Sequence, residues 1–162
     1  MQLKYRGISA LRDRLRRLER QVEDPRDVMA AIGADLMERV REGFENEHDP
    51  YGLPWKPLAP ATLEHRRKRG VGAKILRDTG DMKESLNYRV AGRNAVAVGF
   101  SDKKAPWHQF GVTIERKTKT GVKKITIPAR AMLPWRRGPG GVQLPPSWLH
   151  GIMTTLEDFL DV

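Results

Sequence analysis

The sequence predicts an α+β protein, and three patterns along the chain point to that class. Apolar residues recur at helical spacing near both ends, as on the buried side of an amphipathic helix. Between these stretches, apolar and polar residues alternate around short turns, which is typical of β-hairpins. We therefore expect N-terminal helices, antiparallel β-hairpins that form a small sheet, and a C-terminal helix.

Length and composition limit the kind of protein this can be. The 162 residues suit one domain, and 39% of them are hydrophobic, which allows a modest core. The chain has no cysteine, so it forms no disulfide or thiolate metal site and fits a reducing cytoplasm. No apolar run approaches the roughly 20 residues that span a bilayer, and the first residues lack the apolar core of a secretory signal. We expect no membrane partner.

Two amphipathic helices are predicted in the N-terminal third. The first is basic, and Ser9 is its candidate cap. Its apolar side consists of Leu11, Leu15, Leu18 and Val22. The second starts at Asp24 and Pro25, a pair typical of an N-cap followed by the first helical residue. Its apolar residues are spaced four apart: Val28, Ile32, Leu36, Val40 and Phe44. We expect residues 1–24 to form a basic extension and residues 25–162 a single domain.

The segment 49–60 is too apolar and too rigid for an ordinary surface loop. Its four prolines fix φ and remove backbone donors, so it fits neither a helix interior nor a central strand. Tyr51 and Trp55 on such a stiff loop lose little entropy when they dock, which makes them candidate interface residues. Trp55 can equally fold back onto the protein's own core, and the sequence leaves both positions open.

The middle of the chain combines short helices with hairpins. Residues 61–69 and the stretch that follows Gly80 predict short helices. Alternating apolar residues predict two hairpins, formed by residues 87–91 with 95–100 and by residues 112–116 with 123–127. Pro128 is expected to end the last of these strands.

The C-terminal part predicts an excursion and then a helix. Residues 134–146 are rich in glycine and proline, which is typical of a flexible or extended segment. Ser147 is the expected cap of the helix that follows. The apolar side of that helix consists of Leu149, Ile152, Met153, Leu156, Phe159 and Leu160.

The net charge of +10 is unevenly distributed along the chain. Acidic residues outnumber basic ones between residues 21 and 50, whereas Glu115 is the only acid between Lys103 and Arg137. No lysine or arginine follows Arg137. Such asymmetry can attract a polyanion or let copies associate through opposite faces. A solvated basic surface without a partner is the alternative.

Two basic clusters are candidates for contact with DNA. Such clusters neutralise phosphates without reading the base sequence. The candidate residues are Arg66, Arg67, Lys68, Lys117, Lys119, Lys123 and Lys124. Neither cluster matches the signature of a known nucleic-acid-binding motif, and an ordinary solvated run of charge explains each equally well.

No motif in the sequence supports catalysis or a bound cofactor. The four histidines lack metal-ligand spacing, and the chain has neither a nucleophile elbow nor a phosphate loop. His108 is the one residue that suggests a hydrolase, but a histidine between Trp107 and Phe110 is more typical of a packed ring. Asp78 and Asp81 flank Gly80, as expected for turn and capping residues. We expect no enzyme activity, no metal and no cofactor.

Several segments, taken in order, carry a resemblance to a known family. They are Phe44 and Asp49-Pro50-Tyr51-Gly52-Leu53-Pro54-Trp55-Lys56-Pro57-Leu58 with Thr62-Leu63, Ile75-Leu76-Arg77-Asp78-Thr79-Gly80-Asp81-Met82 with Ser85-Leu86, Val96-Ala97-Val98-Gly99, Trp107-His108-Gln109-Phe110-Gly111 and Ile127-Pro128-Ala129-Arg130-Ala131-Met132-Leu133. Together they resemble the phage virion morphogenesis family, the tail completion proteins of tailed bacteriophages and prophages. The chain departs from the family pattern at Trp107, where a small residue or tyrosine is commoner, and in the long stretch 134–146.

The resemblance implies a non-enzymatic structural protein that acts late in virion assembly. Such proteins complete the tail or the head–tail junction, and related proteins work as homo-oligomeric rings. The implied partners are further copies of the chain and tail tube, terminator or head connector proteins. The implied location is the virion, after assembly in the cytoplasm of the bacterial host. The alternative function is sequence-independent DNA binding through the basic surface.

A ring gives possible roles to the residues that the sequence singles out. Arg130 follows a predicted strand and is expected to point outward, where it pairs either with a neighbouring subunit or with a carboxylate of its own fold. The candidate interface residues are Tyr51, Trp55, Trp107 and Arg130. The acidic helix and the basic hairpin can join neighbours head to tail, and a basic lumen tolerates passing DNA.

Overall fold

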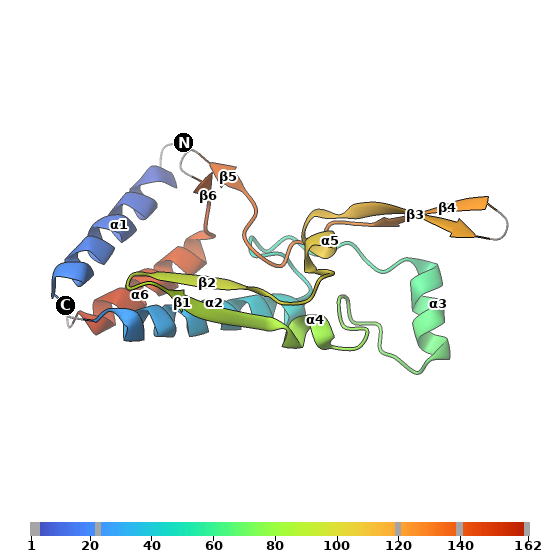
Figure 1. Ribbon diagram of the computed structural model, residues 1–162, viewed down its shortest axis with the longest axis horizontal. Coiled ribbons are helices and arrows are strands. Elements are labelled where there is room, and N and C mark those ends of the chain that lie inside the picture. Colours follow the sequence, from blue (N-terminus) through green and yellow to red (C-terminus); the bar gives the residue numbers. More distant parts are fainter. Residues whose placement is uncertain (1–3, 22–23, 119–120, 139–140, 161–162) are drawn as a thin grey trace. The chain divides into compact units, whose positions relative to one another are not determined.

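The structure, a computed structural model, describes residues 4–21, 24–118, 121–138 and 141–160 (Figure 1). The α+β class is confirmed, with helices at both ends and antiparallel strand pairs between them. The described helices are α1 (Lys4–Gln21), α2 (Arg26–Asn46), α3 (Pro60–Lys68), α4 (Asp81–Glu84), α5 (Ala105–Phe110) and α6 (Pro146–Phe159). None of these helices is long and apolar enough to cross a membrane.

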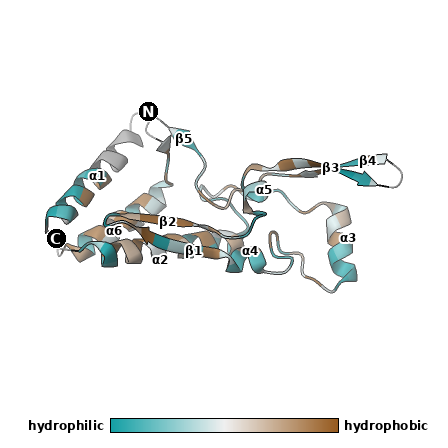
Figure 2. Cartoon of the chain, viewed as in Figure 1, coloured by the Kyte–Doolittle hydropathy of each residue, from teal (hydrophilic) through white to brown (hydrophobic). Residues whose placement is uncertain are grey.

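The expected small sheet is divided into separate strand pairs. In the described part of the chain, each pair is a two-stranded sheet, with β1 next to β2, β3 next to β4, and β5 next to β6. The strands are β1 (Leu86–Ala91), β2 (Ala95–Phe100), β3 (Val112–Thr118), β4 (Gly121–Ile127), β5 (Arg137–Gly138) and β6 (Gly141–Val142). Hydrophilic residues lie at the outer end of the β3–β4 hairpin, and hydrophobic residues lie nearer its base (Figure 2).

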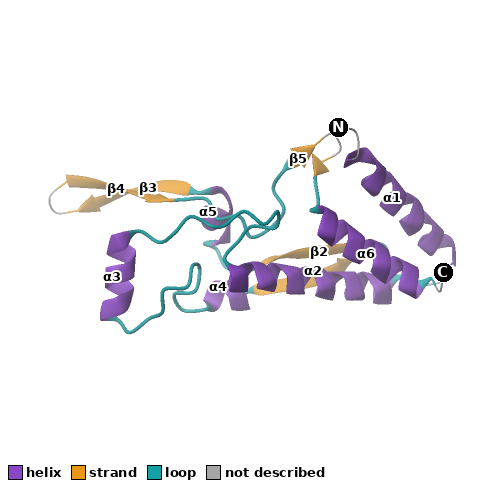
Figure 3. Cartoon of the chain, turned by 180° about the vertical axis from the view of Figure 1, so that it is seen from behind, coloured by secondary structure: helices purple, strands orange, loops and turns teal. Residues whose placement is uncertain are grey.

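The chain divides into two compact units. The first unit consists of residues 1–39, 87–99 and 144–162. The second unit consists of residues 40–86 and 100–143. Loops make up much of the second unit, whereas helices dominate the first (Figure 3).

The first unit has a core of apolar side chains from α2 and α6. The core residues are Val28, Met29, Ile32, Ile152 and Leu156. Leu11 and Leu15 of α1 pack against this cluster, and Arg14 of α1 forms a 2.7 Å ion pair with Glu157 of α6. Apolar residues at helical spacing therefore meet on the buried sides of three helices, as the sequence predicts.

A glycine lets the first hairpin approach α2 closely. A Cβ atom at Gly33 would collide with the ring of Tyr88 on β1 and contact Val96 on β2. Any larger residue at this position of α2 would therefore push the hairpin away.

The second unit has an aromatic cluster at its centre. Phe44 is 0% exposed, and its ring meets the Trp55 ring edge-on, with centroids 5.3 Å apart. The Phe100 ring lies 5.9 Å from that of Phe44.

The predicted apolar side of α2 is confirmed at Val28, Ile32, Val40 and Phe44, all buried.

The short helix α5 was not expected from the sequence. It holds Trp107, His108, Gln109 and Phe110, and it ends at Gly111 with φ 74°. A Cβ atom there would lie 2.9 Å from the backbone nitrogen of Ala129, so only glycine fits this junction.

Helix caps agree with the sequence at one end of the chain and not at the other. Asp24 Oδ1 accepts the backbone N–H of Arg26 at 3.1 Å, as expected for the cap of α2. The prediction for Ser147 is wrong, because α6 already begins at Pro146 after Pro145. Proline at the first helical position has a suitable φ and needs no N–H partner.

Some predictions concern residues that the structure does not describe. Val22 and Lys119 lie outside the described residues, as do the side chains of Ser9 and Leu18. The excursion 134–146 includes the described residues of β5 and β6.

Candidate functional site

The proline-rich loop of the second unit is shaped by a buried aspartate. Asp49 is 5% exposed, and its Oδ1 atom accepts the backbone N–H groups of Tyr51 at 2.8 Å and Leu53 at 2.9 Å. Its Oδ2 atom accepts the indole N–H of Trp135 at 3.2 Å. An aspartate that binds the backbone two residues later forms a tight turn, so the sequence Asp-Pro-Tyr-Gly closes on itself.

Trp55 packs on the core of its own unit. Its side chain is 6% exposed, and its indole N–H donates to the carbonyl oxygen of Ala131 at 2.9 Å. Of the two positions that the sequence leaves open for Trp55, the structure shows the core position. The residue thereby joins the proline-rich loop to the segment 127–133.

Tyr51 connects the same loop to the excursion. Its hydroxyl donates to the carbonyl oxygen of Gln143 at 2.6 Å and accepts the backbone N–H of Arg136 at 3.0 Å. The Arg136 guanidinium lies 4.2 Å from the centroid of the Tyr51 ring. Tyr51 is half-buried, and all of these contacts lie within the second unit.

Gln109 fixes the segment after Arg130, and sequence reasoning missed it. Its Oε1 atom accepts the N–H groups of Met132 at 2.8 Å and Leu133 at 3.0 Å. Its Nε2 atom donates to the carbonyl oxygen of Leu133 at 2.9 Å. The only signal in the sequence is an amide side chain placed between aromatic residues, which does not identify its partners.

The expectation that Arg130 points outward is wrong. Its side chain is 6% exposed, with Nε donating to the Lys56 carbonyl at 2.7 Å and an Nη donating to the Pro57 carbonyl at 2.9 Å. Burial lowers the pKa of Arg130, and the nearby charge of Arg66 acts in the same direction. The extended loop supplies two neighbouring carbonyls that match the guanidinium fork, and this turns the side chain inward.

The first basic cluster is partly buried. Arg66 is 7% exposed and donates to the carbonyl oxygens of Lys74 at 2.6 Å and Gly72 at 3.2 Å. Arg67 and Lys68 are exposed, and Lys68 forms a 2.8 Å ion pair with Glu64. In this cluster, Arg67 and Lys68 are therefore accessible to a polyanion, whereas the side chain of Arg66 is buried.

The second basic cluster lies on the β3–β4 hairpin, and Lys117, Lys123 and Lys124 are exposed there. Strand register places Val112 opposite Ile127, Ile114 opposite Ile125, and Arg116 opposite Lys123 on one face. We call these six residues the hairpin face. It is apolar near the base and carries two facing cations toward the tip.

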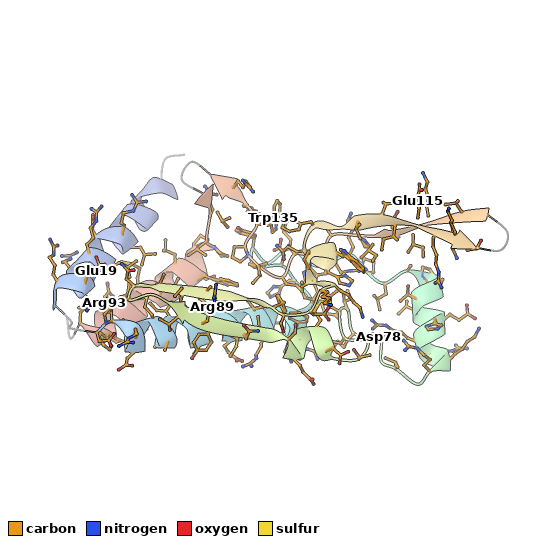
Figure 4. All side chains as sticks on the ribbon, viewed as in Figure 1. Glu19, Asp78, Arg89, Arg93, Glu115 and Trp135 are labelled. Atoms are coloured by element: carbon orange, nitrogen blue, oxygen red, sulfur yellow. The ribbon has the colours of Figure 1, made fainter. Side chains whose placement is uncertain are left out.

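The other face of the hairpin is polar. Thr113 and Thr126 lie opposite each other, with their hydroxyl oxygens 3.2 Å apart. Glu115, labelled in Figure 4, forms a 3.2 Å ion pair with Lys124. The exposed cations of the hairpin face have no such acid opposite them in the register.

Two aromatic residues of α5 are exposed. Trp107 is 43% exposed, as an interface candidate requires, and Phe110 is 74% exposed. Phe110 lines one hollow of about 260 Å³ with Met132 and another of about 450 Å³ with Leu53 and Trp135. Phe110 was not among the interface residues predicted from the sequence.

His108 is half-buried in the last turn of α5. Burial lowers the pKa of His108, the charges of Arg130 and Lys104 lower it further, and that of Asp102 opposes them. Its Nδ1 atom is buried and has no hydrogen-bond partner among the described residues. Within the same residues, no group of three side chains is arranged to hold a metal ion.

Comparison with known protein families identifies the family of this chain. The family model described as the phage virion morphogenesis family matches residues 7–143. The chain belongs to the phage virion morphogenesis family. The match includes the proline-rich loop, α5 and the β3–β4 hairpin. No curated protein and no solved structure matches the chain significantly. Membership of this family supports a structural role in the assembly of the phage particle.

Proposed function

We propose that this virion morphogenesis protein is a non-enzymatic structural component that completes the phage tail or the head–tail junction as a homo-oligomeric ring. The observation that carries the proposal is the β3–β4 hairpin. Within the described residues its strands pair only with each other, and Ile125 is 38% exposed on the hairpin face. A two-stranded hairpin alone is marginally stable in water, so a neighbouring subunit that covers it would stabilise it.

The first unit carries a surface of complementary character. Exposed residues of α2 are spaced three or four apart and form one stripe: Asp27, Ala31, Ala34 and Glu38. We call these residues the acidic stripe. Its alanines let the apolar part of a hairpin face approach closely, and the acid at either end of the stripe suits the facing cations Arg116 and Lys123.

Contact between the hairpin face of one copy and the acidic stripe of the next is heterologous. Such contacts repeat around an axis and close into a ring when the rotation permits. The ring would dock on tail tube, terminator or head connector proteins. The exposed cations Arg67, Lys68 and Lys117 would then tolerate DNA that passes through the assembly.

Sequence-independent DNA binding is the second candidate function, and one observation favours it. Arg116 lies directly opposite Lys123, and like charges in facing positions destabilise a strand pair. A phosphate backbone would relieve this repulsion as well as the acidic stripe would. A steep fall in duplex affinity of the monomer with rising salt would support this function.

Charge reversal separates the two candidates. We expect the double variant Arg116→Glu and Lys123→Glu to weaken self-association at least tenfold in mass photometry, because like charges across an interface cost several kcal/mol. The double variant Asp27→Lys and Glu38→Lys should have the same effect. A one-to-one mixture of the two variants should recover assembly. The intact hairpin face of one variant meets the intact acidic stripe of the other, and the two reversed surfaces are again opposite in charge.

The matched control is Arg67→Glu with Lys68→Glu, which reverses two exposed charges outside the hairpin face. This control should assemble like the unaltered protein. Loss of duplex binding in the hairpin variant with unchanged self-association would favour DNA binding over the ring.

A further inference from the structure

The second unit contains a groove of about 630 Å³ beside the base of the β3–β4 hairpin. Its apolar lining consists of Leu58, Leu76, Met82, Ile125 and Ile127. Arg66 and Arg130 also line it, and both side chains are more than nine-tenths buried. We call this hollow the arginine groove.

The two buried guanidinium groups leave the groove with a positive lining. Both donate chiefly to backbone carbonyls, and Arg130 forms no ion pair with any carboxylate of the described residues. Arg66 has one carboxylate nearby, with its Nε atom 3.6 Å from Asp78. Carbonyl oxygens satisfy the N–H groups without cancelling the charge, so a ligand carboxylate would be favoured here.

The two acids that line the groove, Asp78 and Asp102, each bind groups of neighbouring residues. Asp78, labelled in Figure 4, also binds Arg69 in an ion pair. Asp102 accepts the backbone N–H of Lys104 at 2.7 Å, as a turn aspartate does. Lys104, an exposed cation, is also among the lining residues. The groove thus combines positive charge with apolar walls. It is complementary to a ligand that presents a carboxylate next to a large apolar side chain.

Backbone strain coincides with this groove. Leu76 has φ 57° and is 8% exposed on the groove wall. A leucine rarely adopts the left-handed region because its Cβ atom is crowded there, and such strain clusters at ligand sites. The groove therefore combines buried charge, apolar walls and a strained wall residue.

The end of α6 has the matching chemistry, because an exposed aromatic side chain lies there next to an exposed carboxylate. Phe159 near the end of α6 is 41% exposed, and the neighbouring Asp158 is exposed. Asp158 is in no ion pair among the described residues, and no lysine or arginine follows Arg137 in the sequence. Among the side chains that the structure describes, the other exposed large apolar residue beside an acid is Leu63, whose neighbour Glu64 pairs with Lys68.

We propose that the arginine groove receives the last turn of α6 from a second copy of this chain. Phe159 would lie against the apolar walls, and the Asp158 carboxylate would lie on the side of Arg130. This inference rests on the proposed ring, in which the first unit of one copy meets the second unit of the next. An aromatic anchor in a pocket beside a charge pair is a common arrangement at the centre of protein interfaces.

Cross-linking tests the position directly, because the chain has no cysteine of its own. Thr79→Cys places a thiol on the groove, and Thr154→Cys places one on an exposed position of α6, one turn before Asp158. The two variants are mixed and treated with a short bismaleimide, and oligomers are followed in parallel by mass photometry. We expect a cross-linked dimer in the mixture. Val142→Cys replaces Thr154→Cys in the control mixture, and we expect at least tenfold less dimer there.

A second variant tests the anchor without altering the groove. Phe159→Ser should weaken self-association at least tenfold, whereas Val142→Ser should leave it unchanged, because both residues are exposed apolar side chains and only one is the proposed anchor. Neither replaced side chain lies in the apolar core cluster of the first unit, so both variants are expected to fold.

The outcomes separate this proposal from the ring itself. Rings that form without the cross-link from Thr79→Cys to Thr154→Cys overturn the groove proposal and leave the ring standing. A monomer at every concentration overturns both. Protection of the groove thiol by duplex DNA, with no protection from a second copy, assigns the groove to phosphate and also overturns the proposal.

Discussion

The interactions that stabilise the inside of the first compact unit differ in kind from those that stabilise the inside of the second. The first unit has a core of apolar side chains, in which Val28 and Leu156 are 0% exposed. The second unit also holds the three buried polar or charged residues found in the described chain, which are Asp49, Arg66 and Arg130. Each binds backbone groups of loops.

Each unit obtains a defined structure in its own way. Helices satisfy their own backbone groups, so the first unit needs only matching apolar sides. Loops leave N–H and carbonyl groups free, and the second unit fills that need with side chains that reach across long stretches of sequence. We therefore expect substitutions to act through lost burial in one unit and through lost hydrogen bonds in the other.

The largest expected effect comes from the core of the first unit. Leu156→Ala should lower the free energy of unfolding by about 2–5 kcal/mol, because the cavity in a closely packed core relaxes only in part. Urea unfolding followed by circular dichroism measures this loss. Thr154→Ala, an exposed position on the same helix, should change stability by less than about 0.5 kcal/mol.

A buried polar residue of the second unit should approach the same magnitude. Asp49→Ala removes three hydrogen bonds, and we expect a loss of about 3 kcal/mol, since a freed N–H group costs on the order of 1–3 kcal/mol only where water cannot reach it. The donors belong to residues that are half-buried or exposed, so water replaces part of what the carboxylate supplied. Asp49→Asn keeps the shape and one acceptor, so it should lose less. A loss no larger than that of Thr154→Ala would end the distinction between the two units.

The smallest expected effect concerns a partly exposed ion-pair network of the second unit. Arg77 and Lys83 both bind the Glu45 carboxylate and lower its pKa from 4.5 to about 2. A lowered pKa in the folded state gives stability that is present above the ordinary value and is lost as the pH falls toward the folded value. Solvent screens the pair, so the loss should be modest.

Glu45→Gln tests this network through its pH dependence. The unfolding midpoint of the unaltered protein should fall more steeply between pH 4.5 and about 2 than that of the variant. Glu42→Gln, an exposed position one turn earlier on α2, serves as the control and should retain the steeper fall. Equal slopes in all three proteins would remove the network as a source of acid sensitivity.

The sequence was sufficient for elements whose pattern repeats. Apolar residues four apart predicted the buried side of α2 through Phe44, and alternation around short turns predicted the hairpins β1–β2 and β3–β4. Asp24 was identified as a cap because that bond joins residues two apart. Local patterns of this kind are visible before the chain is folded.

The rest could not be predicted because it depends on contacts between distant segments. Arg130 reaches carbonyls of Lys56 and Pro57, which lie 74 and 73 residues away, and this turned an expected surface residue inward. Gln109 holds backbone groups 23 and 24 residues away, with no periodic signal. Such bonds follow from how loops meet, which no local pattern encodes.

The central claim is that the exposed surfaces of the two units meet between copies and close into a ring. Native mass spectrometry over a concentration series tests it most directly. We predict one closed oligomer of fixed stoichiometry that does not grow further as the concentration rises, because a closed ring leaves no free surface. A monomer at every concentration, or a series of oligomers without a fixed end, would contradict the claim.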